Sequence, residues 1–386
     1  MTSTYEDAIA LGLPLAGIRV LDATSNIAGP FSGAILADLG AEVIKIETPE
    51  GDPTRAMAPI DGDRSAYFHV VNRNKTSQSI DLKSPIDRAT LEKMLDECDI
   101  FLTNFLQARL EALNLTAEAL MKTRPTLIFG NLSSYGGVGP NADTPGYDAT
   151  IQARTGIMHI TGESDGPPVR TGVSVLDIGS GMWLAIGVLA ALVKRNATGL
   201  GSVVETSLFE TGALFVSYHV SAQQIHGKSS VRSGSGHPTF APYGLFPTQE
   251  GTLCIGVGND NIYAKLCRLL GREDLIADPR FLTNSDRVAN NHVLVGEIEE
   301  ALAVDTAVNW ARILGTGGVP ADRLALPEDL HSDVQASAIQ ALLPYPDSTT
   351  PVVRLPGLPL RFDGVRPPIR KPAPHLEPHL KNRIEK

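Results

Sequence analysis

The sequence predicts an α/β fold, with an open parallel sheet in the first part of the chain and a smaller α+β region after it. Three observations support this prediction. The chain starts with a strand, a helix and a strand; strands and helices then alternate as far as residue 133; and the pattern changes near Gly227. Alternating strands and helices are typical of a parallel sheet covered by helices.

The first strand–helix–strand unit lies within residues 17–47. Residues 17–22 are a short apolar run after a turn, which predicts a buried strand. Residues 31–39 have a helical composition, and Gly40 stands where a helix would end. Residues 41–47 then predict the second strand. This β-α-β unit implies parallel strands joined by a right-handed crossover.

The same alternation continues along the chain. We expect helices over residues 85–97 and 117–123, and strands over residues 100–105 and 126–133. A short strand is expected at residues 173–176, followed by Asp177, a helix that runs to Arg195, and a strand over residues 202–207.

The character of the sequence changes after that point. Residues 227–237 are rich in Ser and Gly and predict a mobile loop or linker. A β-hairpin is then expected from residues 243–246 and 252–257. Helices over residues 262–270 and 293–303 follow, and an apolar strand is expected at residues 351–355. We interpret the middle of this region as a smaller α+β domain.

Composition excludes several classes of protein. With 386 residues, 42% of them hydrophobic, the chain suggests two or three domains that need no disulfides. Three scattered cysteines indicate a reducing compartment, and an acidic N-terminal segment argues against a signal peptide, so we expect a cytoplasmic protein. The net charge of −10 disfavours nucleic-acid binding. The apolar run 181–193 is too short to cross a bilayer, so we expect a buried helix and no membrane association.

Several segments match known functional motifs only in part, or lack the secondary structure that the motif requires. The first loop has Gly29 and Gly33 but lacks the Gly-x-Gly-x-x-Gly of dinucleotide-binding proteins. Residues 222–229 resemble a P-loop only faintly, because no helix follows. Residues 162–166 match Gly-x-Ser-x-Gly, but Pro167 follows where a helix would be needed, so we interpret them as a turn. No histidines have metal-ligand spacing, and we predict no metal site.

Asp177 is the best-placed acid in the sequence. It is expected at the end of a strand, where open sheets bind ligands, and at the start of a helix, whose dipole would keep the carboxylate ionised. The alternative is a plain helix cap, a role that Asp often has. Asp148 and Asp165 are weaker candidates, because Asp is common in turns.

A longer series of motifs makes the sequence recognisable. The run Leu-Ala-Asp-Leu-Gly-Ala-Glu-Val-Ile-Lys-Ile-Glu is one of twelve segments, spread in order over most of the chain, that match one family. They are residues 15–22, 28–30, 36–47, 51–55, 72–75, 81–82, 104–105, 135–136, 146–148, 165–168, 177 and 278–281. In these segments the chain resembles the class III CoA-transferases, the family of formyl-CoA and carnitine CoA-transferases, to which α-methylacyl-CoA racemase is distantly related.

The resemblance implies a chemistry and a set of site residues. Asp177 would be the nucleophile that moves CoA from an acyl-CoA to a carboxylic acid, through a mixed anhydride and an aspartyl-CoA thioester. Backbone N–H groups of residues 234–236 are the candidates for stabilising each oxyanion. No cofactor would be bound permanently, since CoA and acyl-CoA are substrates. The residues implied near CoA are Ile27, Ala28, Leu82, Lys83, Asn104, Phe105 and Tyr135, with Lys83 on a phosphate and Phe105 beside the adenine.

The resemblance also implies the architecture. A large Rossmann-like domain would come from residues 1–200 and 326–386, a linker from residues 201–225, and a small domain from residues 226–325. Two chains would form an interlocked homodimer.

Some positions depart from the family pattern. Thr48 stands where an arginine is common, Ser133 where formyl-CoA transferases carry lysine, and Leu106 where arginine often follows Asn-Phe. The alternative activity is acyl-CoA racemisation, with Asp177 in α-proton transfer. Racemases of this family have His before the acid at position 148, whereas this chain has Tyr147, a poor proton acceptor near neutral pH. The acceptor acid depends on pocket shape and is not predicted.

Overall fold

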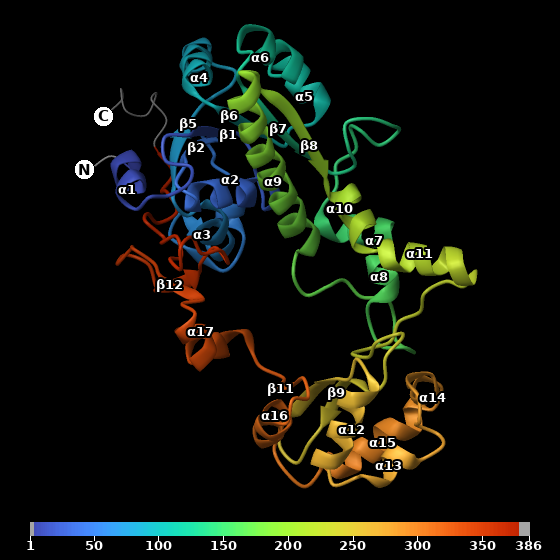
Figure 1. Cartoon of the computed structure of the whole chain (residues 1–386). Coiled ribbons are helices and arrows are strands. Elements are labelled where there is room, and N and C mark those ends of the chain that lie inside the picture. The colour runs from blue at the N-terminus through green and yellow to red at the C-terminus, as the bar shows by residue number, and fades with distance from the viewer. Residues whose placement is uncertain (1–3, 378–386) are drawn as a thin grey trace. The chain divides into compact units, whose positions relative to one another are not determined.

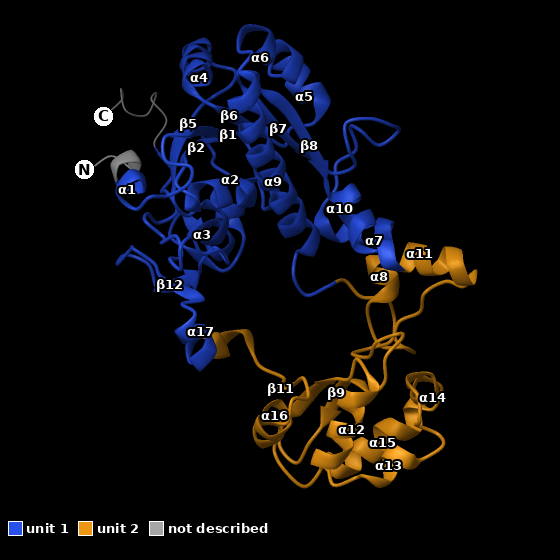
Figure 2. Ribbon diagram, in the orientation of Figure 1, with its two compact units in different colours: residues 1–155, 171–218, 331–386 blue, residues 156–170, 219–330 orange. Residues whose placement is uncertain are grey.

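The computed structural model describes residues 4–377, which fall into two compact units (Figure 2). Unit 1 contains residues 1–155, 171–218 and 331–386, and unit 2 contains residues 156–170 and 219–330. Unit 1 is therefore built from both ends of the chain. The last residues of the expected segment 326–386, from 378 onward, lie outside the described part.

Unit 1 is organised around a six-stranded sheet, and all neighbouring strands in it are parallel. The strand order is β5-β2-β1-β6-β7-β8 (Figure 1). The strands are β1 (Arg19–Asp22), β2 (Glu42–Glu47), β5 (Lys75–Ser79), β6 (Ile100–Thr103), β7 (Ile128–Ser133) and β8 (Ser202–Ser207).

Helices cover both faces of this sheet. On one face α4 (Pro85–Glu97), α5 (Gln107–Ala112) and α6 (Ala117–Thr123) form a core with Phe101 and Phe129. Neighbouring strand residues point to opposite faces, so Gly130 lies on the other side. There α2 (Ala28–Asp38) packs against α9 (Val175–Thr198). A Cβ at Gly130 would lie 2.7 Å from Leu102 Cδ2 and 3.3 Å from Leu184 Cδ1, so α9 approaches the sheet as closely as glycine allows.

Local signals in the sequence explain where these helices begin and end. At the start of α4, the Ser84 hydroxyl accepts a hydrogen bond from the Asp87 N–H, and Pro85 occupies the first turn. At the end of α9, Gly199 adopts a left-handed conformation with φ of 73°. The predicted helices 85–97 and 117–123 and the predicted strand 202–207 have the same bounds in the structure.

Two expectations about these elements were wrong, and one strand was missed. Residues 173–176 are not a strand, because α9 already begins at Val175 and places Asp177 in its first turn. Residues 201–225 are not a linker, because they supply β8, α10 (Leu208–Phe215) and α11 (Ser217–His226). Strand β5 was not predicted, because Lys-Thr-Ser-Gln-Ser lacks the apolar alternation of a typical strand.

The C-terminal part of unit 1 is held by buried polar contacts. It contains α17 (Val334–Ala338), β12 (Leu342–Pro344) and β13 (Arg354–Pro356). The Tyr345 hydroxyl lies 2.8 Å from His69 Nδ1 and accepts a hydrogen bond from the Ala373 N–H. Arg64 is buried and donates to Asp347 at 2.7 Å. These contacts join residues that are far apart in the sequence.

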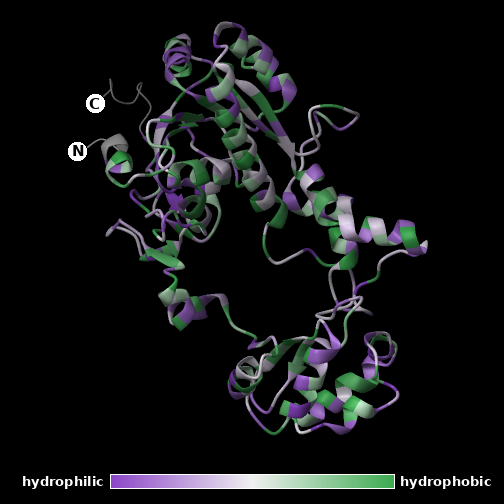
Figure 3. Cartoon of the chain, viewed as in Figure 1, coloured by the Kyte–Doolittle hydropathy of each residue, from purple (hydrophilic) through white to green (hydrophobic). Residues whose placement is uncertain are grey.

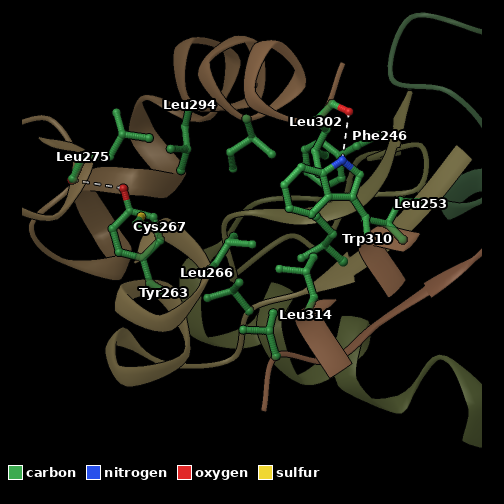
Figure 4. Packing of buried hydrophobic residues seen from close by; sticks show 14 of the residues in the cluster. Phe246, Leu253, Tyr263, Leu266, Cys267, Leu275, Leu294, Leu302, Trp310 and Leu314 are labelled. Atoms are coloured by element: carbon green, nitrogen blue, oxygen red, sulfur yellow. Dashed lines mark hydrogen bonds between the residues drawn. The ribbon is translucent and has the colours of Figure 1, made fainter. Parts of the chain in front are cut away.

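Unit 2 has a small antiparallel sheet and its own core. Strands β9 (Tyr243–Pro247), β10 (Thr252–Gly256) and β11 (Ala321–Arg323) pair in the order β11-β10-β9, so the expected hairpin is present. Two core side chains also satisfy their polar atoms: the Trp310 indole N–H donates to Leu302 O at 3.0 Å, and the Tyr263 hydroxyl to Leu275 O at 3.2 Å (Figure 4). The helices include α12 (Asp260–Leu269), α13 (Asp274–Ala277), α14 (Asn284–Ala289), α15 (Asn291–Leu302) and α16 (Ala307–Thr316).

Helix α9 is the most apolar long helix in the described chain (Figure 3). Its length and composition alone would allow it to cross a membrane, and half of its most apolar window is buried within the chain. It packs against α2, β7 and β8. The helix thus has a buried face in the core of unit 1 and a second face, with Met182, Trp183 and Ile186, that is exposed in the single chain.

Candidate active site

A cavity of about 230 Å³ lies at the carboxyl ends of the central strands of unit 1. Its lining includes Asn104, which follows β6, Asn131 and Ser133 in the second half of β7, and Ser25 after β1. Asp177, in the first turn of α9, also lines it. Because ligands of open α/β sheets bind outside the carboxyl ends of the strands, this cavity is the candidate active site.

The Asp177 carboxylate has no hydrogen-bond donor within the described residues, whereas its backbone is held firmly. The buried Asp148, in the first turn of α7 (Asp148–Thr155), accepts hydrogen bonds from Leu176 N at 2.7 Å and Asp177 N at 3.2 Å. Asp148 thus satisfies two free N–H groups at the start of α9, as a capping side chain does. The Gln152 amide donates to the other oxygen of Asp148. Asp148 is therefore a buried anchor for the start of α9, whereas sequence alone left open a supporting role in the cleft or a plain turn residue.

Two effects raise the pKa of Asp177 from 3.8 to about 7. The larger is burial, which disfavours the charged carboxylate, and the second is the negative charge of Asp148. Both effects oppose ionisation, and the expectation that the helix dipole favours the charged carboxylate stays a prediction. A carboxylate with a pKa near neutrality is more basic than an ordinary aspartate, and is still substantially ionised at pH 7.

A buried charge network supports the loop after β1. The Asp22 carboxylate accepts hydrogen bonds from Thr24 N at 3.0 Å and from Lys75 Nζ at 2.8 Å. Lys45 Nζ donates to Thr24 O at 2.9 Å and pairs with Asp52 Oδ2 at 2.7 Å. All five side chains are buried. Burial lowers the pKa of Lys75 to about 8 against the opposing effect of Asp22.

The loop itself is fixed to the next strand end by an amide. Asn104 Oδ1 accepts from Ser25 N at 3.0 Å, and Asn104 Nδ2 donates to Ser25 O at 2.8 Å. Asn26 has a φ of 66°, a left-handed conformation that Asn tolerates better than most residues. Asn104 therefore holds the loop that forms one wall of the cavity.

A second cavity adjoins the first, and a third adjoins the second. The second shares Ser25 and Phe105 with the Asp177 cavity, and the third shares Leu82 and Arg109 with the second. Together the three form one trough (the Asp177 trough) along the carboxyl edge of the sheet. Arg109 stacks on one face of the Phe105 ring, with its guanidinium carbon 3.9 Å from the ring centroid.

Most of the residues expected near CoA line this trough. Ala28, Asn104 and Phe105 line the Asp177 cavity, and Leu82 and Lys83 line the third. The other two do not line these cavities: Ile27 is the N-cap of α2, and the Tyr135 ring packs against Phe209 at 6.0 Å between centroids. Sequence reasoning missed Asn26, Asn131 and Arg109, which line the cavities without belonging to any recognised motif.

Other motifs have structural roles or belong to the other unit. Residues 162–166 are a turn closed by a hydrogen bond from Gly166 N to Glu163 O, which agrees with our interpretation of Asp165. Residues 234–236 belong to unit 2, so their role as oxyanion donors stays a prediction. Across residues 4–377, no three His, Cys, Asp or Glu side chains gather as a metal site would require.

A doubly covered parallel sheet with a basic, unpaired carboxylate at its carboxyl edge defines an α/β enzyme suited to covalent catalysis. Comparison with known proteins gives the particular family. The sequence matches CoA-transferase family III over residues 15–380, so the chain belongs to this family and is a CoA-transferase.

Named relatives agree with this assignment. The chain is 37% identical over 367 residues to the acetyl-CoA:oxalate CoA-transferase of Acetobacter aceti, which covers 94% of this chain and 93% of that protein. It is 33% identical to the succinyl-CoA:glutarate CoA-transferase of Mus musculus, over 96% of this chain and 85% of that protein. Among solved structures, a CAIB/BAIF family protein from Brucella suis has a TM-score of 0.85 and 34% identity, covering 96% of this chain and 99% of that one.

Proposed function

We propose that Asp177 is the covalent nucleophile of the CoA transfer. The observation that carries this proposal is its free carboxylate, which lines the cavity, accepts no hydrogen bond from residues 4–377, and has a pKa raised to about 7. A structural aspartate at a helix start normally uses its carboxylate to cap N–H groups. Here Asp148 performs that capping, so the Asp177 carboxylate is left available for reaction.

The proposed reaction proceeds in four steps. The Asp177 carboxylate attacks the thioester carbonyl of the donor, the C–S bond breaks, and CoA leaves as a thiolate with Asp177 in a mixed anhydride. The thiolate then attacks the Asp177 carbonyl of the anhydride, which forms an aspartyl-CoA thioester and releases the donor carboxylate. The acceptor carboxylate attacks this thioester, which regenerates an anhydride and the thiolate. Attack of the thiolate on the acceptor's carbonyl forms the new acyl-CoA and frees Asp177.

In this proposal Asp148 is a positioning residue. Its hydrogen bonds to Leu176 N and Asp177 N fix the first turn of α9, and its negative charge makes the neighbouring carboxylate more basic. A more basic carboxylate is a better nucleophile once ionised, but a smaller fraction is ionised at a given pH. A pKa close to ambient pH is a compromise between these two effects.

We further propose that CoA lies along the Asp177 trough. The thioester would reach Asp177. Leu82 and Phe105 would contact apolar parts of CoA, and Lys83 would bind a phosphate. The adenine cannot use the face of Phe105 that Arg109 already covers, so it would stack on the guanidinium or on the remaining ring surface.

The acceptor in this proposal is a small dicarboxylic acid. The relatives above are named for oxalate and glutarate. Asn26, Asn131 and Ser134 place polar groups in the wall of the Asp177 cavity. These groups could form hydrogen bonds with the second carboxylate of a dicarboxylic acceptor.

The working unit in this proposal is an interlocked homodimer in the cytoplasm. Large apolar side chains of α9 and α10 are exposed in the single chain: Met182, Trp183, Ile186, Leu214 and Phe215. Contiguous apolar surface of this kind favours an interface. All three cysteines are free thiols, in keeping with a reducing compartment. Light scattering after size exclusion would test the proposal, and a monomer at micromolar concentration would contradict it.

Trapping the covalent intermediate tests the nucleophile. Wild type and Asp177→Asn would each be incubated with a panel of acyl-CoAs, treated with hydroxylamine, and measured by intact-protein and peptide mass spectrometry. We expect a hydroxamate at Asp177 in wild type and none in the variant. A hydroxamate at another residue would refute the assignment. The absence of any adduct, together with α-proton exchange into heavy water, would favour the racemase alternative.

A further inference from the structure

Arg109 is a cation that the described part of the chain leaves without an acidic partner. Its side chain on α5 is exposed, and within residues 4–377 it forms no ion pair and its guanidinium donates no hydrogen bond. The half-buried Arg88 of α4 differs, because it pairs with Glu92 at 2.9 Å. Stacking on Phe105 orients the guanidinium plane while leaving its N–H groups free to bind an anion.

Arg109 and Asp177 lie in different parts of the Asp177 trough. It lines the second and third cavities but not the first, which contains Asp177. Phe105 lines the first two and so lies between Asp177 and Arg109 along the trough. The guanidinium is therefore at the end that is distant from the reacting carboxylate.

Thr48 lines the same two cavities as Arg109. It occupies the position after Lys-Ile-Glu at which the resemblance to class III enzymes leads us to expect an arginine. The carboxylates Glu47 and Asp52 also line the second cavity, but they are neutralised by Arg55 and Lys45.

The third cavity contains Lys83 as its other cation, with Glu50 and Asp81 as its acids. The Asp81 carboxylate accepts the backbone N–H of Lys83 at 3.0 Å. Arg109 and Lys83 are thus the two cations available to an anion at this end of the trough.

We propose that Arg109 binds the phosphorylated adenosine end of CoA and supplies, from α5, the positive charge that position 48 lacks. This inference rests on the proposed function, because it places the thioester at Asp177. A CoA thioester carries its negative charge on the diphosphate and the 3′-phosphate, remote from the acyl group. A guanidinium binds phosphate oxygens through two parallel hydrogen bonds, and the free N–H groups of Arg109 meet that requirement at the matching end of the trough.

Calorimetric binding of CoA, dephospho-CoA and pantetheine to wild type, Arg109→Ala and Arg109→Lys tests the inference without requiring turnover. We expect Arg109→Ala to weaken CoA binding about tenfold or more and to leave pantetheine binding unchanged. Arg109→Lys should restore part of the loss, because it keeps the charge but loses the paired hydrogen bonds. If the loss is the same for dephospho-CoA, the contact is with the diphosphate; if it disappears, the contact is with the 3′-phosphate.

The control is Arg268→Ala, which removes an exposed arginine of unit 2 and should leave all three affinities unchanged. Equal weakening of CoA and pantetheine by Arg109→Ala would overturn the inference, because the effect would then come from distortion of Phe105. Unchanged CoA binding in Arg109→Ala would also overturn it. Failure of wild type to bind CoA at all would instead contradict the proposed function.

Discussion

The raised pKa of Asp177 predicts that ionisation of its carboxyl group destabilises the folded protein. Below pH 3.8 the carboxyl group is protonated in both the folded and the unfolded chain, so there is no penalty. As pH rises toward the folded pKa of about 7, the unfolded chain releases this proton first and folding stability falls. A difference of one pKa unit corresponds to about 1.4 kcal/mol, so the change from 3.8 to about 7 costs about 4 kcal/mol above pH 7.

Asp177→Asn should remove this penalty. The amide has nearly the shape of the protonated acid and carries no charge, so we expect the variant to gain up to about 4 kcal/mol over wild type between pH 4 and pH 8. Urea unfolding at several pH values and one protein concentration measures the difference. The control is Asp165→Asn, a substitution in the exposed turn of unit 2, which should show no such trend. A stability difference between wild type and Asp177→Asn that is the same at pH 4 and pH 8 would refute the reasoning.

Three other predictions follow from the contacts above. Asp148→Asn keeps a hydrogen-bond acceptor for the α9 amides but removes the charge, so the acid limb of the kcat pH profile should move to lower pH; an unmoved limb would mean that burial alone sets the pKa of Asp177. Lys75→Met leaves the buried Asp22 carboxylate without its ion partner and should cost roughly 3–5 kcal/mol in urea unfolding, whereas Lys122→Met on the surface should cost little. Trp310→Ala should destabilise unit 2 by roughly 3–5 kcal/mol, and hydrogen exchange should locate the loss in α15 and α16; protection that falls evenly over both units would contradict this.

Local patterns were sufficient for much of the fold. Helix α4 has Ser84 and Pro85 at its start, and the hairpin β9–β10 has apolar runs around a Gly-containing turn, so both could be predicted from neighbouring residues. Strand β5 could not, because Lys75 is buried through its ion pair with Asp22 and not through an apolar side chain. That partner is fifty-three positions away in the sequence, and no local pattern contains it.

The candidate site, like the fold, could be predicted from the sequence only in part. Asp177 could be singled out because it belongs to a recognisable series of motifs. The capping role of Asp148 and the cationic position of Arg109 depend on which elements lie side by side, so they emerged only with the structure. The start of α9 was misplaced for a related reason: its first N–H groups are satisfied by a residue of α7, which sequence proximity does not reveal.

The return of the chain to unit 1 has a consequence for synthesis on the ribosome. Arg64 and His69 emerge early, but their partners Asp347 and Tyr345 are made only after the whole of unit 2. Domains generally fold as units in the order in which they are synthesised. In this chain the inserted unit is complete before its host, so Arg64 and His69 of the nascent α/β unit lack these partners until the segment after residue 330 is added.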